Sequence, residues 1–338
     1  MKSNTKSKTL SSKQILNSKH GFSKHIFEFV SLGFRYSRFG FVMRVAMIIF
    51  LAAALGFLYA GAGDAGAAFL KIPVDARIVG MGEASVSFVD NASAMFYNPA
   101  GLGKIKSLDI TFMHNAWLLG MNHEYLSSAF AVQKIGTFGI AFNYWGSGAI
   151  PIITIRGDST GETFSASDWT ISLGYGRVFG DLSVGGSFKY LKESNEEFGA
   201  SSMSIDLGAG YDLPIKGLKA GMSVTNLGSG FSLDQEQYAL PMLFRLGWKY
   251  DLGNLGCTQD FIISNADPVG FALGLEYRVA EMLALRAGYR SGSGVEGLSG
   301  LRSGIGIAIK GFGINYAVAP YGKLGIAHRV SLSFTILR

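Results

Sequence analysis

Large apolar residues alternate with small or polar residues along most of the chain, from Ser107 to the C-terminus. The stretch FALGLEYR at 271–278 shows the pattern, with Phe, Leu, Leu and Tyr at every second position. A period of two places successive side chains on opposite faces of a β-strand. We therefore predict fourteen strands, since no segment after residue 107 shows a convincing helical period. The predicted strands are 107–117, 122–133, 136–146, 168–178, 181–191, 201–212, 217–227, 239–250, 255–265, 269–278, 282–291, 300–310, 312–320 and 326–337.

The length of these strands and the connections between them favour a membrane-spanning barrel. Each predicted strand has about 9–12 residues, which is the length needed to cross a bilayer at a tilt, whereas strands of soluble proteins have about 5–6. The clearly tight connections and the clearly long ones alternate, so they fall at opposite ends of the strands. Outer-membrane barrels have this asymmetry and an even number of strands. We predict an all-β fold, an antiparallel transmembrane β-barrel of about 14 strands with an N-terminal plug segment.

The alternating pattern also assigns the two faces of the barrel wall. In a transmembrane barrel the large apolar side chains face lipid, and the small and polar side chains face the lumen. A Lys or Arg that faced lipid near the midplane would cost about 2–4 kcal/mol, so we expect the charges of the polar face inside. These lumen charges are Lys189, Asp206, Arg245, Lys249, Glu276, Arg278, Arg286 and Arg290. The alternative, a large soluble barrel with its charges outside, explains neither the strand lengths nor the loop asymmetry.

Composition supports a folded β-protein and excludes a nucleic-acid partner. Glycine supplies 46 of the 338 residues and only 16% are charged, against roughly 7% Gly and 25% charged residues on average. A disordered chain has the opposite balance. The formal net charge of +6 comes from residues 1–44, which hold nine Lys or Arg and one acid. The rest of the chain has 21 basic and 23 acidic residues, so it has no general basic surface.

The N-terminal region is typical of a leader that ends in a secretory signal. Arg44 precedes the apolar run VAMIIFLAAALGFLY at 45–59, and Ala60-Gly61-Ala62 supplies a cleavage site. A membrane anchor is the alternative, but the run is shorter than the ~20 residues that a spanning helix needs. We predict a leader and cleaved signal peptide at 1–62, with Met43 as an alternative start, a plug segment at 63–106 and the barrel at 107–338. Cys257, the single cysteine, excludes an internal disulfide.

Residues 63–106 lack the strand pattern and separate the signal from the first strand. Their centre, ARIVGMGEASVSFVDNASAMFYNPAGLG at 76–103, is rich in small residues and nearly uncharged. A fourteen-stranded barrel encloses a lumen wider than its own side chains fill, so we predict a plug inside the barrel or at its mouth. The end of this stretch is typical of a turn, because Pro99 fixes φ and Gly101 permits a tight reversal.

The same residues carry a resemblance to a known family. Three motifs resemble the PorV/PorQ family of outer-membrane proteins, which is similar to the fatty-acid-transport porins typified by FadL. The motifs are Arg77-x-x-Gly80-Met81-Gly82-x-Ala84, Asp90-Asn91-Ala92-Ser93-Ala94 and Tyr97-Asn98-Pro99-Ala100-Gly101-Leu102. The resemblance extends through the alternating strands and implies a fourteen-stranded outer-membrane barrel with a plug. The chain departs from many such barrels at its end, where Ile336-Leu337-Arg338 stands in place of a terminal aromatic residue.

The resemblance implies a non-enzymatic function, and two versions of it remain open. PorV-type members assist type IX secretion, so the first expectation is a role in protein secretion or surface assembly, with outer-membrane lipid, secretion-system components or exported cargo as partners. The alternative is a FadL-like transporter of long-chain fatty acids or other hydrophobic molecules. A structural barrel that conducts nothing is a third hypothesis. The hypothetical ligand or partner site consists of Arg77, Gly80, Met81, Gly82, Asp90, Asn91, Tyr97, Asn98, Pro99, Ala100, Gly101 and Leu102.

Residues that could carry catalysis or bind a metal are sparse. After the signal the only histidines are His114, His123 and His328, without a ligand set at metal spacing. The chain has no G-x-S-x-G motif of a serine hydrolase. Gly80-Met81-Gly82 is not framed by the strand and helix that a dinucleotide-binding loop requires. We therefore expect no catalytic residue, no metal and no cofactor.

Overall fold

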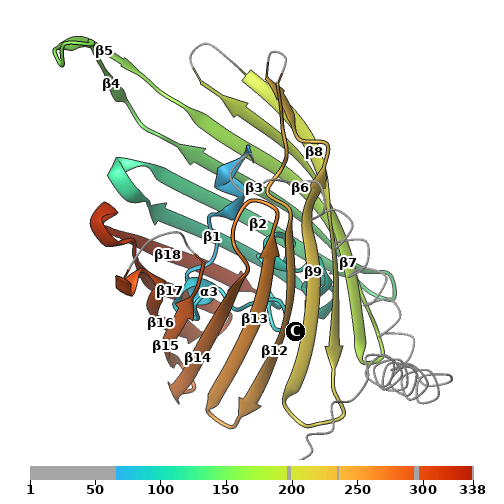
Figure 1. Cartoon of the computed structure of the whole chain (residues 1–338). Coiled ribbons are helices and arrows are strands. Elements are labelled where there is room, and N and C mark those ends of the chain that lie inside the picture. The colour runs from blue at the N-terminus through green and yellow to red at the C-terminus, as the bar shows by residue number, and fades with distance from the viewer. Residues whose placement is uncertain (1–65, 196–198, 234–235, 293–296, 337–338) are drawn as a thin grey trace, which may run out of the picture. The chain divides into compact units, whose positions relative to one another are not determined.

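The alternating segments form a closed barrel in the computed structural model, which describes residues 66–195, 199–233, 236–292 and 297–336 (Figure 1). Hydrogen-bonded neighbours follow the order β1-β18-β17-β16-β15-β14-β13-β12-β9-β8-β7-β6-β3-β2, so the predicted fourteen-stranded antiparallel barrel is confirmed. The barrel strands are β1 (Leu108–Ala116), β2 (Asn122–Val132), β3 (Gly136–Gly146), β6 (Ser167–Phe179), β7 (Leu182–Ser194), β8 (Gly199–Asp212), β9 (Leu218–Gly228), β12 (Leu243–Leu252), β13 (Leu255–Ser264), β14 (Gly270–Ala280), β15 (Leu283–Arg290), β16 (Leu301–Ile309), β17 (Phe312–Pro320) and β18 (Ile326–Thr335).

The barrel closes between its first and last strands. β1 pairs with β18 from Asp109 opposite Thr335 to Ala116 opposite His328. The faces are inverted relative to a soluble barrel, because Phe271 is 38% exposed on the outside while its neighbour Ala272 is fully buried. A continuous apolar outer face is what a bilayer requires of a spanning barrel.

The two ends of the barrel differ in the length of their connections. At one end, Gly180, Gly253 and Gly311 sit in tight turns with φ of 64°, 64° and 87°, and left-handed residues of this kind suit short hairpins. We call this end the tight-turn end and the opposite end the long-loop end. A two-stranded hairpin of β4 (Ile150–Ile153) and β5 (Ser159–Phe164) projects at the long-loop end (Figure 1). A second small hairpin there consists of β10 (Phe231–Leu233) and β11 (Glu236–Tyr238).

Helices in the described part of the chain are short. They are η1 (Ala68–Lys71), α3 (Ala76–Gly80), α4 (Ala94–Tyr97), η2 (Pro99–Lys104), η3 (Leu118–Gly120), η4 (Gly297–Gly300) and η5 (Gly322–Leu324). None of these helices combines the length and the apolar character that a membrane span needs. The predicted leader and signal peptide lie outside the described residues.

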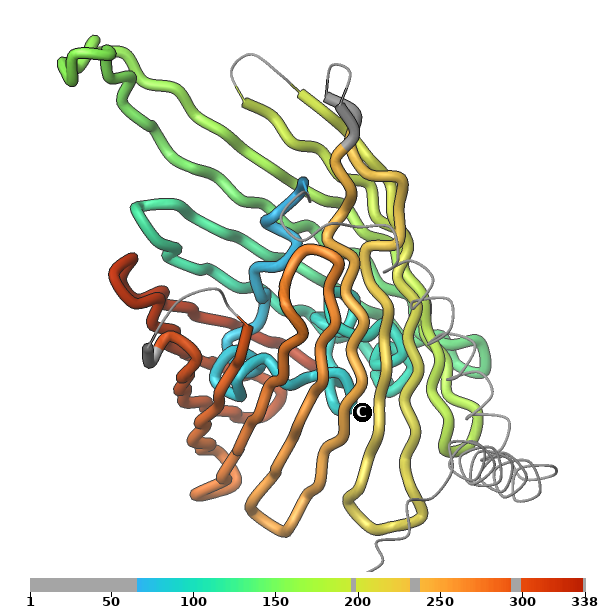
Figure 2. The backbone as a smooth tube through the Cα atoms, viewed as in Figure 1, coloured from blue at the N-terminus to red at the C-terminus, as the bar shows by residue number. Residues whose placement is uncertain are grey.

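Residues 66–106, which we call the inner segment, run along the inside of the barrel wall (Figure 2). The segment begins at the long-loop end, where η1 packs against Leu191, Phe231 and Leu240. Its helix α3 then packs along β15–β18. Farther along the segment, η2 packs along β6–β8. The segment lies inside the barrel wall. That it acts as a plug stays a prediction.

Candidate functional site

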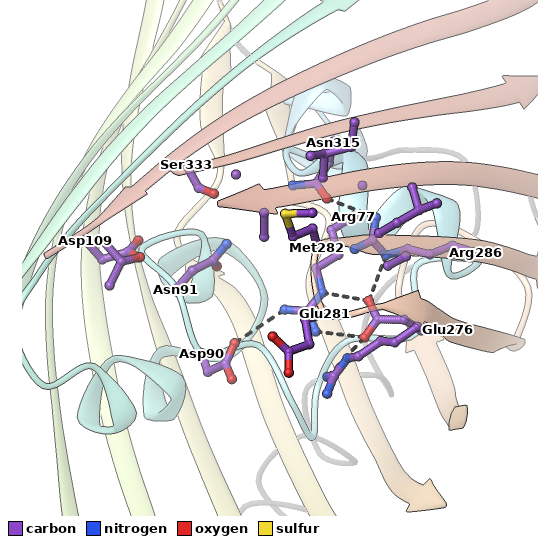
Figure 3. Close-up of a pocket in the computed structure, with 18 of the residues that line it drawn as sticks. Arg77, Asp90, Asn91, Asp109, Glu276, Glu281, Met282, Arg286, Asn315 and Ser333 are labelled. Carbon is purple, nitrogen blue, oxygen red and sulfur yellow. Dashed lines mark hydrogen bonds and ion pairs between the residues drawn. The ribbon is translucent and has the colours of Figure 1, made fainter. Parts of the chain in front are cut away.

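A cavity of about 540 Å³ lies between the inner segment and the wall at the tight-turn end of the barrel (Figure 3). The inner segment contributes Arg77, Asp90 and Asn91 to its lining. The wall contributes residues of β14–β18 and β1, among them Glu276 and Arg286. We call it the tight-turn cavity. Its lining carries charges of both signs beside apolar side chains, so it suits a hydrated passage or an amphipathic molecule better than a purely apolar one.

Glu276 is the centre of an ion-pair group in this cavity. Its side chain is 3% exposed, and its Oε2 lies 3.1 Å from Arg77 Nε and 2.8 Å from Arg286 Nε. Arg278 Nη2 lies 3.5 Å from the other carboxylate oxygen. Arg286 also donates to Asn315 Oδ1 at 2.9 Å (Figure 3). A buried carboxylate shared between guanidinium groups is the arrangement in which such charges are stable.

Arg77 reaches this group because α3 is fixed at its first turn. Asp75 is the N-cap and its side chain accepts from Arg77 N, as N-cap aspartates do. The Ala76 amide donates to Ser331 Oγ on β18 at 2.8 Å. Burial alone would lower the pKa of Arg77, but the carboxylates of Glu276 and Asp90 outweigh it and raise that pKa. Arg77 therefore stays charged and ties the inner segment to β14.

Asn98 joins the inner segment to the opposite side of the wall. Its amide nitrogen donates to Val86 O at 2.6 Å and to Ala209 O on β8 at 3.0 Å. Its amide oxygen accepts from Ala100 N at 3.1 Å and so caps η2. Every hydrogen-bonding atom of this buried side chain thus has a structural partner, and none is left to bind a ligand.

Tyr97 and Gly101 also serve the inner segment itself. Tyr97 is buried, its hydroxyl accepts from Val74 N at 3.0 Å, and burial raises its pKa. A side chain at Gly101 would collide with the carbonyl of Val89. The predicted turn at 98–102 is a 3₁₀ helix with Asn98 as N-cap and Pro99 in its first turn, where proline is favoured because its missing N–H has no intrahelical partner to lose.

Glycines of the wall lie where the backbone of the inner segment touches it. A Cβ on Gly185 of β7 would lie against Pro99 O and 2.7 Å from Ala100 N. One on Gly221 of β9 would meet Val86 O, and one on Gly176 of β6 would be 2.6 Å from Gly103 N. These strand glycines therefore permit a close backbone approach. Opposite them, Asp260 of β13 accepts from Ser85 N at 2.7 Å and Val86 N at 3.0 Å.

The predicted motif residues have different positions in the structure. Arg77, Asp90 and Asn91 line the tight-turn cavity. The other nine pack against the wall or the inner segment: Gly80 against Gly304, Met81 against Gly274, Gly82 against Leu273 and Tyr289, Leu102 against Gly174, and Tyr97, Asn98, Pro99, Ala100 and Gly101 as described above.

The predicted lumen charges also divide. Glu276, Arg278 and Arg286 line the cavity. Lys189 lies 2.8 Å from Asp206 in a separate buried pair, and Lys249 lies 2.6 Å from Asp251. Arg245 donates to Glu83 O at 3.2 Å, and Arg290 Nε lies 3.6 Å from Glu83 Oε2. Most of these charges therefore hold the wall and inner segment together.

Sequence reasoning missed several buried polar residues of the lumen. Asp260 stands at a polar position of the alternating strand 255–264, and Arg329 shares its face with Ser331, so the strand period alone could have found both. The alternation of β16 likewise places Arg302, its second residue, on the buried lumen face. The described residues contain no group of three or more His, Cys, Asp or Glu side chains that could hold a metal ion.

Comparison with known proteins identifies the fold. No family model matches the chain, and no curated protein matches it. Among solved structures, the deltaS2S3 mutant of the monoaromatic hydrocarbon channel TodX is 14% identical, covers 77% of this chain and 98% of its own, and has a TM-score of 0.55. The Ralstonia pickettii toluene transporter TbuX is 14% identical, with coverages of 78% and 98% and a TM-score of 0.54. The P. putida toluene transporter TodX is 12% identical, with coverages of 77% and 97% and a TM-score of 0.51.

These similarities establish that the chain shares its barrel fold with the monoaromatic hydrocarbon channel TodX and the toluene transporter TbuX. They do not test the PorV/PorQ resemblance itself, which stays a prediction. The names of these neighbours describe a hydrocarbon channel and a toluene transporter.

Proposed function

We propose that this chain is an outer-membrane channel of FadL type that carries small hydrophobic molecules through its lumen, with the inner segment as its plug. The observation that carries the proposal is the lumen itself, where a chain segment contacts the wall yet leaves a cavity of about 540 Å³ beside β14–β18. The shared fold with toluene transporters supports it. A non-enzymatic role fits the same neighbours.

The route we propose runs along the side of the lumen formed by β14–β18. At the tight-turn cavity on this side the inner segment meets the wall through the ion pair of Arg77 and Glu276, which water can separate and solvate. Beyond the cavity the backbone of Met81 and Gly82 packs on Gly274 and Gly288, so the route is open to solvent only at the cavity. On the side of β6–β9 the backbone of the segment lies directly against glycines, so no molecule can pass without displacing it. The apolar outer face of the barrel places it in a bilayer, and the predicted signal peptide would direct it for export.

Uptake measurements test this function directly. The gene is expressed in a bacterial host that lacks its own hydrophobic-molecule channel, and uptake of labelled toluene and of a labelled long-chain fatty acid is measured. We expect faster uptake of at least one of them than in cells with an empty vector. The double variant Arg77→Cys/Glu276→Cys, made in a Cys257→Ser background, allows a disulfide between the inner segment and β14. Formation of this disulfide should abolish the increase in uptake. Equal uptake with and without the protein, when the barrel is assembled, contradicts the proposal.

A secretion role is a second candidate, supported by the family motifs and by the β4–β5 hairpin. This hairpin pairs with no barrel strand and exposes Ile153 and, fully, Ile155 at the long-loop end. Exposed loops of this kind commonly bind partners. Deletion of the gene in its own host, followed by proteomics of the cell surface, tests this role. Unchanged surface proteins would leave transport as the function.

A further inference from the structure

A second cavity, of about 330 Å³, lies at the tight-turn end of the barrel, away from β14–β18. It is formed where the last residues of the inner segment meet the turn between β2 and β3 and the end of β6. The described residues that line it include Lys106, Lys134 and Arg177 but no Asp or Glu. We call it the basic cavity. Its single sign of charge distinguishes it from the tight-turn cavity, which has charges of both signs.

The three cations of the basic cavity are exposed and are not neutralised by the part of the chain that the structure describes. No ion pair joins Lys106, Lys134 or Arg177 to a described carboxylate. By contrast, Lys104, two positions before Lys106, lies 2.9 Å from Asp212. A cleft lined by one sign of charge concentrates ions of the opposite sign. The basic cavity therefore attracts an anionic group from outside the chain.

Arg177 places this cavity at the edge of the lipid-facing surface. Tyr175 belongs to the outer face of β6, because its ring packs at 5.2 Å on that of Phe138, which is 39% exposed. Arg177 follows two positions later and so stands on the same face. Its guanidinium carbon lies 5.0 Å from the ring centroid of Phe179. A lipid-facing arginine is costly at the bilayer midplane but costs little near the interface, so we place Arg177 at the level of the lipid headgroups.

Apolar side chains continue from the cavity over the outer face of the barrel. Ile135, in the turn that lines the cavity, is 51% exposed. The rings of Phe130 and Phe138 stack at 5.7 Å, and Tyr175 extends this row onto β6. Acyl chains can lie along such a strip, whereas a water-soluble acidic partner would leave it unused. The surroundings of the cavity therefore suit an amphiphile with an anionic headgroup.

We propose that the basic cavity binds the phosphate headgroup of an anionic phospholipid from the surrounding membrane, with Lys106, Lys134 and Arg177 as its ligands. Lysine and arginine form strong charge-assisted hydrogen bonds with phosphate oxygens. Short turns of outer-membrane barrels face the periplasm, so the lipid belongs to the periplasmic leaflet. The lipid is a bound component of the wall and not a transported molecule. Because Lys106 lies between the inner segment and β1, the lipid would hold the end of that segment against β6.

Lipid titration of the purified barrel in non-ionic detergent, followed by native mass spectrometry, tests the site. The probes are dioleoyl phosphatidylglycerol, dioleoyl phosphatidylcholine with the same acyl chains but no net charge, and inorganic phosphate as a competitor without acyl chains. Each Lys or Arg near an anionic lipid surface strengthens attachment about fivefold at low salt. We expect the wild type to bind phosphatidylglycerol at least about tenfold more tightly than phosphatidylcholine, and the difference to shrink as salt is added.

The double variant Lys134→Gln/Arg177→Gln should remove this preference. Lys106 is left unchanged in it, because Lys106 also lines the tight-turn cavity. The matched control is Lys216→Gln/Lys310→Gln, which removes the same charge from exposed residues of other turns at this end. The variant Lys134→Arg/Arg177→Lys keeps both charges and should keep the preference.

Equal affinity of the wild type for the two lipids overturns the proposal. Equal losses in the test variant and in the Lys216→Gln/Lys310→Gln control also overturn it, because they would show a response to net charge alone. Inorganic phosphate that displaces the lipid at an equal concentration would show a free anion site and would overturn the part played by the acyl chains. None of these outcomes depends on uptake of a hydrophobic molecule, so the channel function and the lipid site stand or fall separately.

Discussion

Beside the tight-turn cavity the inner segment meets the barrel wall through the side chains of Arg77 and Glu276. Toward β6–β9, and also against Gly274 and Gly288 of β14 and β15, it meets the wall through its own backbone. On the first side Arg77 and Glu276 form the main link, and a cavity of about 540 Å³ remains beside them. On the second side Pro99 and Gly103 lie against Gly185 and Gly176, where a single added methyl group would collide.

The difference shows which of these contacts can change without rebuilding the wall. Charged side chains can exchange a protein partner for water, since both partners are strong hydrogen-bonding groups. Backbone packed on glycine has no such second arrangement, because interiors are close-packed and transmit any displacement. We therefore expect variants on the two sides to fail differently, and the predictions below run from the largest effect to the smallest.

Glu276→Gln should have the largest effect on stability. The substitution leaves the buried Arg286 and the partly buried Arg77 without this carboxylate, and the loss of one partner of a buried pair costs about 3–5 kcal/mol. Unfolding in urea of the barrel reconstituted in lipid vesicles, followed by tryptophan fluorescence, measures it. Glu281→Gln is the control, because Glu281 lines the same cavity but is exposed. An equal effect of both variants would show that the link is not structural.

Gly185→Ala should weaken docking of the inner segment by about 1–3 kcal/mol, the usual cost of overpacking. Its neighbour Gly186 on the other face of β7 provides the control, because the nearest atom to an added Cβ there is 3.3 Å away. Limited proteolysis of the inner segment in the assembled barrel reports docking. Equal protection in Gly185→Ala and Gly186→Ala would contradict the close backbone contact.

Asn98→Ala should release the η2 side of the inner segment at a cost of about 1–3 kcal/mol, because it strips hydrogen bonds from the buried carbonyls of Val86 and Ala209. Gly101→Ala should act in the same direction. Labelling of Met95→Cys in a Cys257→Ser background should become faster while the barrel keeps its heat-modifiable mobility on gels. Loss of that mobility before any gain in labelling would show that these residues serve barrel assembly instead.

Ile155→Ser should have the smallest effect, within about 0.5 kcal/mol, as surface substitutions usually do. Ile155 is fully exposed in the β4–β5 hairpin region and contacts neither side of the inner segment. It therefore sets the baseline for the four test variants above. A decrease in exported surface proteins without a change in stability or uptake would favour the secretion role.

The barrel was predictable from the sequence because one rule governs every strand. Alternating residues such as Phe271 and Ala272 face lipid on one side of the wall and the lumen on the other. The sequence of each strand therefore indicates by itself which of its residues face lipid. The position of the inner segment followed from its missing alternation. Its anchors did not follow, because Asp260 meets Ser85 and Val86 across 174 or more positions of sequence, and no local pattern encodes that distance.

The candidate site was predictable only in part for a related reason. The motif residues were singled out together, but the structure divides them between a cavity and the packing of a segment. Asn98 is a case in point, since its amide could bind a ligand and instead satisfies two carbonyls. Arg329 escaped notice although it follows the strand period, because only the fold shows that none of the described residues hydrogen-bonds its guanidinium group.

The pairing of β1 with β18 has a consequence for how the molecule is made. The inner segment precedes β1 in the chain, yet Ala76 binds Ser331 of the last strand. The segment is therefore synthesised first and enclosed last, when the C-terminal strand seals the cylinder around it. Contacts that join such distant parts of a chain form slowly, so the growing sheet must remain an open trough with the segment lying in it until the seam closes. A folding catalyst in the membrane would then act on a partly filled sheet, and closure of the β1–β18 seam would fix the inner segment inside the finished barrel.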